Sequence, residues 1–312
     1  MGMYCFGIDV GGTSVKCGLF LTNGTLVEQW EIPTRLENNG SSILPDVADA
    51  IKTKLDERGI TKDNVDGVGI GIPGPVNENG EVPMAVNLHW GFKAVASELS
   101  ALTGLPAKAA NDANIAALGE AWKGAAEGSK NVILVTLGTG VGGGIIVDGK
   151  VVAGFNGAGG EIGHITVNND EIEACNCGQY GCLEQYTSAT GIVRLAKRKL
   201  AKSTEETSIR EIPNLTAKDV FDAAKAGDAI AIGLVDEVCE ILGSTLSNIA
   251  CVVNPEIIVI GGGVSKAGDI LLDNIKKHFV ETSFMACRDT KFALAGLGND
   301  AGMYGCVEML LD

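Results

Sequence analysis

Three cysteines and one histidine lie close together near the middle of the sequence. Cys175, Cys177 and Cys182 share one glycine-rich segment, and His164 stands a short loop upstream of them. Thiolates and imidazoles are ligands that zinc prefers in proteins, and a structural zinc site takes four of them in a tetrahedron. The segment therefore predicts a structural Zn²⁺ site with three sulfur ligands and one nitrogen ligand.

These cysteines have two other interpretations. A free cysteine is often only a small buried apolar residue. A disulfide needs an oxidising compartment, whereas this sequence has an odd total of nine cysteines and no recognisable secretory signal. We favour metal binding, because closely spaced thiols in a reducing compartment more often hold a metal.

Two carboxylates, Glu161 and Glu184, flank this metal segment. A metal-bound imidazole keeps a second ring nitrogen that can donate a hydrogen bond away from the metal. We therefore expect the metal to hold Glu161, His164 and Glu184 in place for binding a polar ligand.

Three glycine-rich turns each follow an apolar run that predicts a β-strand. The first two turns share one pattern, in which a second strand and then a hairpin signal follow, Asn23-Gly24 in one case and Asp148-Gly149 in the other. Such turns let backbone N–H groups approach phosphate oxygens. The repeat indicates an internal duplication with two turns facing one nucleotide, and the third turn, which opens a helix, suits the adenosine or ribose part. The turn residues are Gly11, Gly12, Thr13, Gly138, Thr139, Gly140, Gly261, Gly262 and Gly263.

Asp112 lies where a predicted strand over residues 107–110 gives way to an alanine-rich helix over residues 115–122. Active groups in α/β folds lie at such carboxyl ends of strands. The alternative is that Asn111 and Asp112 only cap the helix, since both types are favoured caps worth about 1 kcal/mol. Both interpretations stay open at this stage.

The composition excludes several classes of partner. A net charge of -15 and a pI near 4.7 argue against nucleic acid, because phosphate binding depends on clustered lysines and arginines. Glycine, threonine or Asn-Pro interrupts the longest apolar stretches, so none predicts a membrane span. We expect a cytoplasmic protein, and 312 residues are enough for two domains.

Taken together, these residues resemble the ROK family of bacterial sugar kinases and repressors, over nearly the whole chain. The cysteine run that begins at Cys175 and ends at Glu184 is the most specific part of the resemblance. A second feature, Asn87-Leu88-x-Trp90, looks like an exposed polar and aromatic loop and is similar to the members that phosphorylate glucose.

The resemblance implies an α/β protein with the two-domain fold of actin-like ATPases and sugar kinases (ribonuclease H-like), and a cleft between the domains. Residues 1–112 with 301–312 would form a small N-terminal domain, and residues 113–300 a large domain that carries the zinc loop. Relatives are commonly dimers or tetramers, so a homodimer or homotetramer is expected.

The resemblance also implies an activity, the ATP-dependent phosphorylation of the 6-hydroxyl of glucose. Asp112 would be the general base, and Asp9 would help to position Mg²⁺ beside the phosphates. The sugar would be held by Asn87, Asn111, Asp112, Glu161, His164 and Glu184. Lys16 departs slightly from the position where many relatives carry a lysine, which puts its contact with phosphate in doubt.

Other functions remain possible at this stage. The substrate could be N-acetylmannosamine, fructose, mannose or allose, and the donor could be polyphosphate. A sugar-sensing repressor would need a DNA-binding segment before the first strand, and the acidic charge opposes it. An actin-like assembly protein would have no use for a carboxylate cluster braced by zinc.

Overall fold

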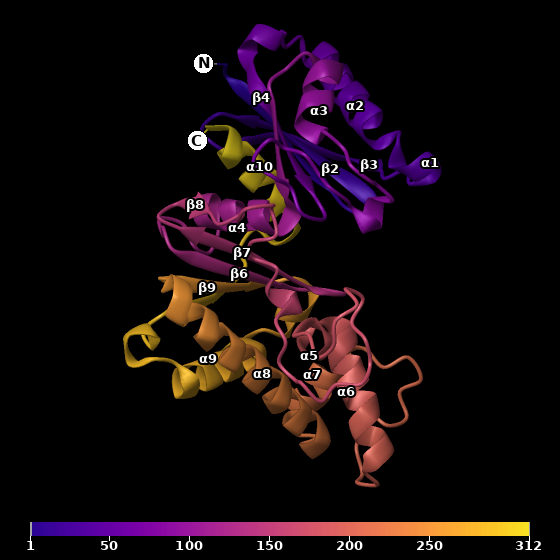
Figure 1. Ribbon diagram of the computed structural model, residues 1–312, viewed down its shortest axis with the longest axis vertical. Coiled ribbons are helices and arrows are strands. Elements are labelled where there is room, and N and C mark those ends of the chain that lie inside the picture. The colour runs from indigo at the N-terminus through magenta and orange to yellow at the C-terminus, as the bar shows by residue number, and fades with distance from the viewer. Residues whose placement is uncertain (1, 312) are drawn as a thin grey trace. The chain divides into compact units, whose positions relative to one another are not determined.

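Each of the two repeated strand–turn–strand patterns lies in a five-stranded sheet of its own (Figure 1). The computed structural model describes residues 2–311. The chain forms two compact units, the first made of the residues up to Gly128, Gly144–Gly160 and the residues from Gly296 onward. The second contains Ser129–Gly143 and Glu161–Ala295.

The first sheet has the strand order β3-β2-β1-β4-β5. β1 pairs antiparallel with β2 and parallel with β4, and β5 continues the parallel part. The carboxyl ends of β1, β4 and β5 therefore lie along one edge of this sheet. The strands are β1 (Tyr4–Val10), β2 (Ser14–Leu21), β3 (Leu26–Pro33), β4 (Val65–Ile72) and β5 (Ala107–Asn111).

Helices of the first unit bury their apolar sides against this sheet. α2 shares a buried cluster with β1, β2 and β4, whereas α10 packs on β1, β4 and α4. α2 ends at Gly59, which has the left-handed φ of 62° that favours glycine at a helix end. The helices are α1 (Glu37–Gly40), α2 (Ile43–Arg58), α3 (Val95–Thr103), α4 (Asp112–Lys123) and α10 (Ala301–Leu311).

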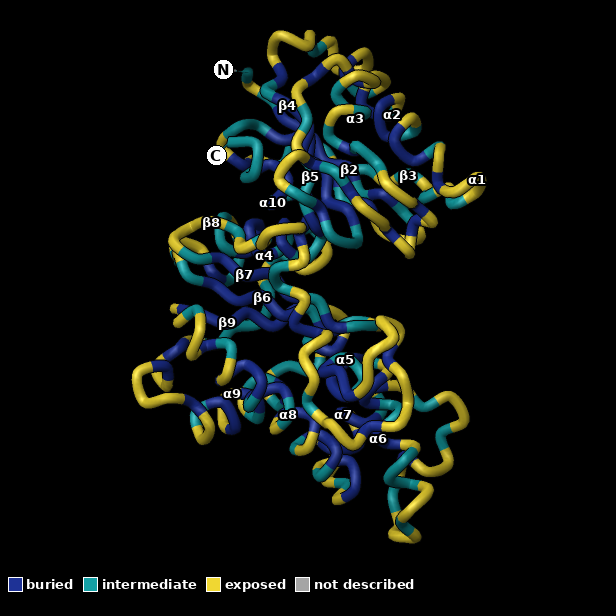
Figure 2. Tube along the Cα trace, viewed as in Figure 1, coloured by how far each residue is buried: buried dark blue, intermediate teal, exposed yellow. Residues whose placement is uncertain are grey.

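The second sheet has the order β10-β9-β6-β7-β8, and β6 and β10 both pair parallel with β9. The strands β1, β2, β4, β6, β7 and β9 of the two sheets are largely buried (Figure 2), whereas β3, β8 and β10 contain no buried residue. The strands are β6 (Val132–Leu137), β7 (Val141–Val147), β8 (Lys150–Val151), β9 (Ile257–Gly261) and β10 (Lys291–Leu294).

Five helices belong to the second unit. α7 begins with the predicted capping box, in which Thr216 and Asp219 satisfy each other's backbone N–H groups. The long helix α8 packs against α7 and α9. The helices are α5 (Glu184–Thr187), α6 (Ala189–Lys202), α7 (Ala217–Lys225), α8 (Ala229–Val253) and α9 (Asp269–Thr282).

The structure confirms the α/β class, but the bounds of its compact units differ from the predicted domain boundaries after residues 112 and 300. The first unit also takes in α4, because this helix packs closely against α10. Within residues 2–311, no helix combines the length and apolar character needed to cross a bilayer.

Candidate functional site

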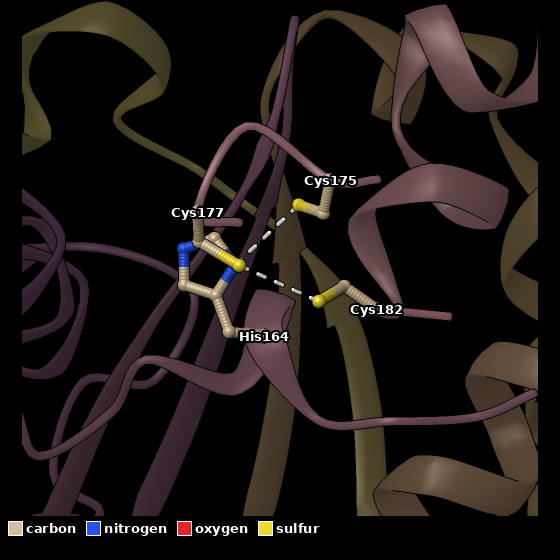
Figure 3. Close-up of side chains that lie close together, drawn as sticks. All are labelled: His164, Cys175, Cys177 and Cys182. Carbon is tan, nitrogen blue, oxygen red and sulfur yellow. Dashed lines mark hydrogen bonds between the residues drawn. The ribbon is translucent and has the colours of Figure 1, made fainter. Parts of the chain in front are cut away.

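The predicted zinc ligands lie together in the second unit (Figure 3). The ligand atoms of His164, Cys175, Cys177 and Cys182 are all within 4.8 Å of one another. The sulfurs of Cys177 and Cys182 are 3.6 Å apart, and the Cys175 sulfur is 3.9 Å from Nδ1 of His164. Two sulfurs bound to one tetrahedral zinc at ~2.3 Å would be roughly 3.8 Å apart. The donor set and its spacing therefore fit a zinc ion.

The two ring nitrogens of His164 have different neighbours. Nδ1 is the nitrogen near the Cys175 sulfur, whereas Nε2 is 3.9 Å from a carboxylate oxygen of Glu161. The side chains of His164 and Glu161 are both exposed, and His164 ends a short 3₁₀ helix, Ile162–His164. A metal on Nδ1 would leave Nε2–H free to donate to a ligand beside Glu161.

Glu184 joins this cluster to the second glycine turn. As the first residue of α5, it accepts a hydrogen bond on Oε2 from the backbone N–H of Val141, at 3.0 Å. Its Oε1 is 3.8 Å from the Cys175 sulfur. A Cβ atom at Gly140 would lie 2.1 Å from Oε2, so only glycine leaves room for this carboxylate. The predicted contact of Glu184 with a sugar hydroxyl stays a prediction.

The second and third glycine turns lie side by side at the carboxyl ends of β6 and β9. Thr136 pairs with Gly261, and a Cβ atom at Gly262 would lie 2.5 Å from the carbonyl oxygen of Leu137. The start of α6 holds the second turn, since the N–H of Ala189 donates to the Gly138 carbonyl and Thr190 Oγ1 donates to that of Thr139, both at 2.8 Å. The two turns thus form one edge of exposed backbone.

A cavity of about 670 Å³ begins at this edge and runs along α6 to the start of α7. Its volume is in the range that small-molecule sites occupy. Sequence reasoning missed it, although three basic residues at helical spacing on α6 were the available signal. Its lining includes Thr139, Glu173, Arg194, Lys197, Arg198 and Thr216.

Asp9 is the last residue but one of β1, and Asp112 directly follows β5, a parallel strand of the same sheet from which β4 separates β1. Burial raises the pKa of the Asp9 carboxyl to about 6, although the positive charge of Lys16 lowers it. The Lys16 ammonium donates to the Asn299 carbonyl at 2.9 Å. The exposed turn of Gly11, Gly12 and Thr13 follows β1 directly. Carboxylate oxygens are the ligands that hard cations prefer, so Asp9 is a candidate ligand for a cation near this turn.

The helix cap beside Asp112 is Asn111. Its Oδ1 accepts from the N–H groups of Ala113 and Asn114, at 2.9 and 3.1 Å, and its Nδ2 donates to the Gly74 carbonyl at 3.0 Å. Asn111 therefore caps the helix, one of the two interpretations that the sequence left open. Asp112 lies half-buried in the first turn of α4, and its Oδ1 also accepts from the N–H of Ala113, at 2.8 Å. Contact of Asn111 with a sugar stays a prediction, and its amide has one hydrogen left for that role.

One sequence expectation is wrong in part. Asn87 is exposed in the 3₁₀ turn Val86–Leu88, as expected, but Leu88 is buried and Trp90 is only 4% exposed. The indole N–H donates to the Gly40 carbonyl at 3.1 Å, and the ring joins the core. Burial of its large apolar surface outweighs exposure in a loop, so Trp90 does not extend an aromatic surface beside Asn87.

Comparisons with known proteins agree over nearly the whole chain. The model of the ROK family matches residues 5–312. The chain is 47% identical over 304 residues to a glucokinase of Halalkalibacterium halodurans, covering 96% of this chain and 92% of that protein. It is 34% identical over 318 residues to the Thermotoga maritima glucokinase, covering 97% and 96%.

The structural comparison points the same way. The crystal structure of a ROK family glucokinase from Streptomyces griseus, in complex with glucose and AMPPNP, superposes with a TM-score of 0.77. The two chains are 32% identical and each is covered over 98% of its length. The expected fold, that of actin-like ATPases and sugar kinases, is thereby confirmed.

Proposed function

This chain belongs to the ROK family, and we propose that it is a glucokinase that transfers the γ-phosphoryl group of ATP to the 6-hydroxyl of glucose. The observation that carries the proposal is the 47% identity, over nearly the full length of both chains, to a glucokinase. The proposal gains support from the carboxylates around the metal cluster, because a neutral sugar offers only hydroxyl groups for recognition.

In this mechanism Asp112 accepts the proton of the 6-hydroxyl as the oxygen attacks phosphorus. Asn111 is the N-cap of α4, and Asp112 follows it in the first turn of the helix, at the carboxyl end of β5. In phosphoryl transfer the protein mainly aligns the reactants and neutralises charge, and a carboxylate orients the attacking oxygen. Glu161, His164 and Glu184 would hold the other sugar hydroxyls, with Asn87 and Asn111 contributing amide groups.

The glycine turns at Gly11, Gly12 and Thr13 and at Gly138, Thr139 and Gly140 would enclose the phosphates, with Gly261, Gly262 and Gly263 near the nucleoside. Mg²⁺, when bound, neutralises charge on the phosphate oxygens. Asp9 would hold it, directly or through water, because its partly desolvated carboxylate would gain a counter-ion.

The four residues His164, Cys175, Cys177 and Cys182 would bind structural zinc. Zinc there would fix the segment between His164 and Glu184 and so the direction of both side chains. We also propose a homodimer or homotetramer located in the cytoplasm.

A coupled assay with ATP and Mg²⁺ across a panel of hexoses tests the proposal. We expect a higher kcat/KM for glucose than for N-acetylmannosamine, fructose, mannose or allose. The same assay with polyphosphate in place of ATP tests the alternative phosphoryl donor. Asp112→Asn should keep glucose binding but lower turnover by about 10²–10⁴-fold, the usual cost of losing a general base. Glucose binding without turnover in the unaltered chain would favour a sugar sensor, and near-normal turnover in the variant would remove Asp112 from the mechanism.

A further inference from the structure

Two carboxylates of the metal-binding loop share two arginines of α6. Glu171 and Glu173 lie between His164 and Cys175 in the sequence, and both pair with Arg194 and Arg198. Ion pairs thus join the loop that carries the metal ligands to α6, in addition to the chain connection between them.

The two carboxylates differ sharply in burial. The Glu171 side chain is 1% exposed, and its oxygens accept from Arg198, Tyr186 and the backbone N–H groups of residues 172 and 173, at 2.7–3.0 Å. The Arg198 guanidinium is the main cause that holds the pKa of Glu171 well below its usual range. Removing a partner from a buried charge is costly, so Glu171 keeps its arginines.

Glu173 is held much less firmly. Its side chain is 57% exposed, with one oxygen 2.8 Å from Nε of Arg194 and the other 2.9 Å from Nη2 of Arg198. Exposed ion pairs contribute little, typically ~0.2–1 kcal/mol. The Glu173 carboxylate can therefore leave its arginines at small cost, while Glu171 stays in place.

Glu173, Arg194 and Arg198 also line the 670 Å³ cavity, together with the exposed Lys197. The cavity wall carries three cationic side chains and one carboxylate, in a chain whose net charge is -15. Threonine hydroxyls and the apolar Val193 and Leu215 complete the lining. This chemistry suits a ligand with both an anionic and an apolar part, and the cavity starts at Thr139 of the second glycine turn.

We propose that this cavity binds a phosphate-bearing ligand and that Glu173 competes with it. The phosphate of the ligand displaces the Glu173 carboxylate from Arg194 and Arg198. The ligand class, a nucleoside phosphate, rests on the proposed kinase function. Glu173 precedes Cys175 by two residues, so its release loosens one attachment of the metal loop while Glu171 keeps another. The competition sets nucleotide affinity and couples the cavity to the loop that carries Cys175.

Calorimetric titration of the full chain with ADP and, separately, with inorganic pyrophosphate tests this role. Glu173→Gln removes the competing charge and should tighten binding of both probes by about 1.4- to fivefold, the range expected from exposed ion pairs. Lys197→Glu replaces an ammonium of the same wall with a carboxylate, a charge change of two units, and should weaken binding of both probes by at least the same factor. Glu206→Gln is the control for Glu173→Gln, because it makes the same change in net charge at an exposed position of the second unit outside the cavity lining. It should leave the affinities for ADP and for pyrophosphate unchanged.

Equal affinities for Glu173→Gln and Glu206→Gln would overturn the inference, as would unchanged binding in Lys197→Glu. The titrations contain no sugar, so they separate this inference from the proposed function. Tighter ADP binding in Glu173→Gln, from a chain that phosphorylates no hexose, would refute only the function. Glucose phosphorylation with no gain of ADP affinity in Glu173→Gln would refute only the competition.

Discussion

Asp9, the proposed ligand of Mg²⁺, lowers the stability of the fold when its carboxyl is ionised, and the size of this effect follows from its pKa. Burial raises the pKa of its carboxyl from 3.8 to about 6. A raised pKa means that the native chain holds this proton more tightly than the unfolded chain does, so stability falls as pH rises through the interval between the two values. At ~1.4 kcal/mol for each tenfold change in proton affinity, the ionised group costs about 3 kcal/mol above pH 7.

Asp9→Asn should therefore stabilise the protein while abolishing its kinase activity. The expected gain in the free energy of unfolding is about 3 kcal/mol at pH 8 but only about 1.6 kcal/mol at pH 5, where the native carboxyl is mostly protonated. In Asp9→Asn, stability is expected to rise while activity falls. Such a trade-off is common where a functional site contains a charged group that is buried away from water.

Urea unfolding in magnesium-free buffer, followed by tryptophan fluorescence, measures this gain selectively. All three tryptophans, Trp30, Trp90 and Trp122, belong to the first unit, which also contains Asp9. Asp63→Asn, at an exposed position of the same unit, is the matched control and should change stability by less than about 0.5 kcal/mol. A gain that is equal at pH 5 and pH 8, or no gain at all, would refute the reasoning from burial.

Two further predictions concern the second unit. Metal analysis of the purified chain should find about one zinc per chain, and Cys177→Ala should lose that zinc and weaken both folding and glucose affinity; zinc-free protein with normal sugar phosphorylation would contradict the bracing role. Glu171→Gln should destabilise the helix α6 and its loop by ~3 kcal/mol near neutral pH, because it leaves two arginine charges without their buried partner. The lowered pKa of Glu171 gives stability that is present above pH 4.5 and is lost as pH falls below it, so hydrogen exchange of α6 should show a much smaller penalty for the variant in acid.

Much of the framework could be predicted because local signals were strong. The bounds of β1, β4 and β6 follow from largely apolar runs that stop at Gly11, Pro73 and Gly138. The end of α2 at Gly59 and the capping box at Thr216 depend only on residues next to them in the sequence. The four predicted zinc ligands come together for a related reason, because three of them share one tight loop.

Features that depend on distant partners could not be predicted in this way. Trp90 is buried because Gly40, far away in the sequence, accepts its indole N–H. The sequence places Arg194 and Arg198 one turn apart on a helix, but it does not show that they neutralise a buried carboxylate of another segment, Glu171. A sequence pattern gives the spacing of charges on a helix, but the partner that neutralises them is set by tertiary packing.

Glu184 shows how the two predicted halves of the ligand site in the second unit are physically joined. The sequence assigned this residue to the sugar and the glycine turn of Gly138, Thr139 and Gly140 to the phosphates. One carboxylate oxygen holds the N–H of Val141, the residue after that turn, while the other faces the Cys175 sulfur. Because a side chain at Gly140 would displace this carboxylate, the glycine is required for the contact between turn and metal cluster as well as for any approach of phosphate. A ligand that moves the turn therefore acts on Glu184 directly, within a single unit of the protein.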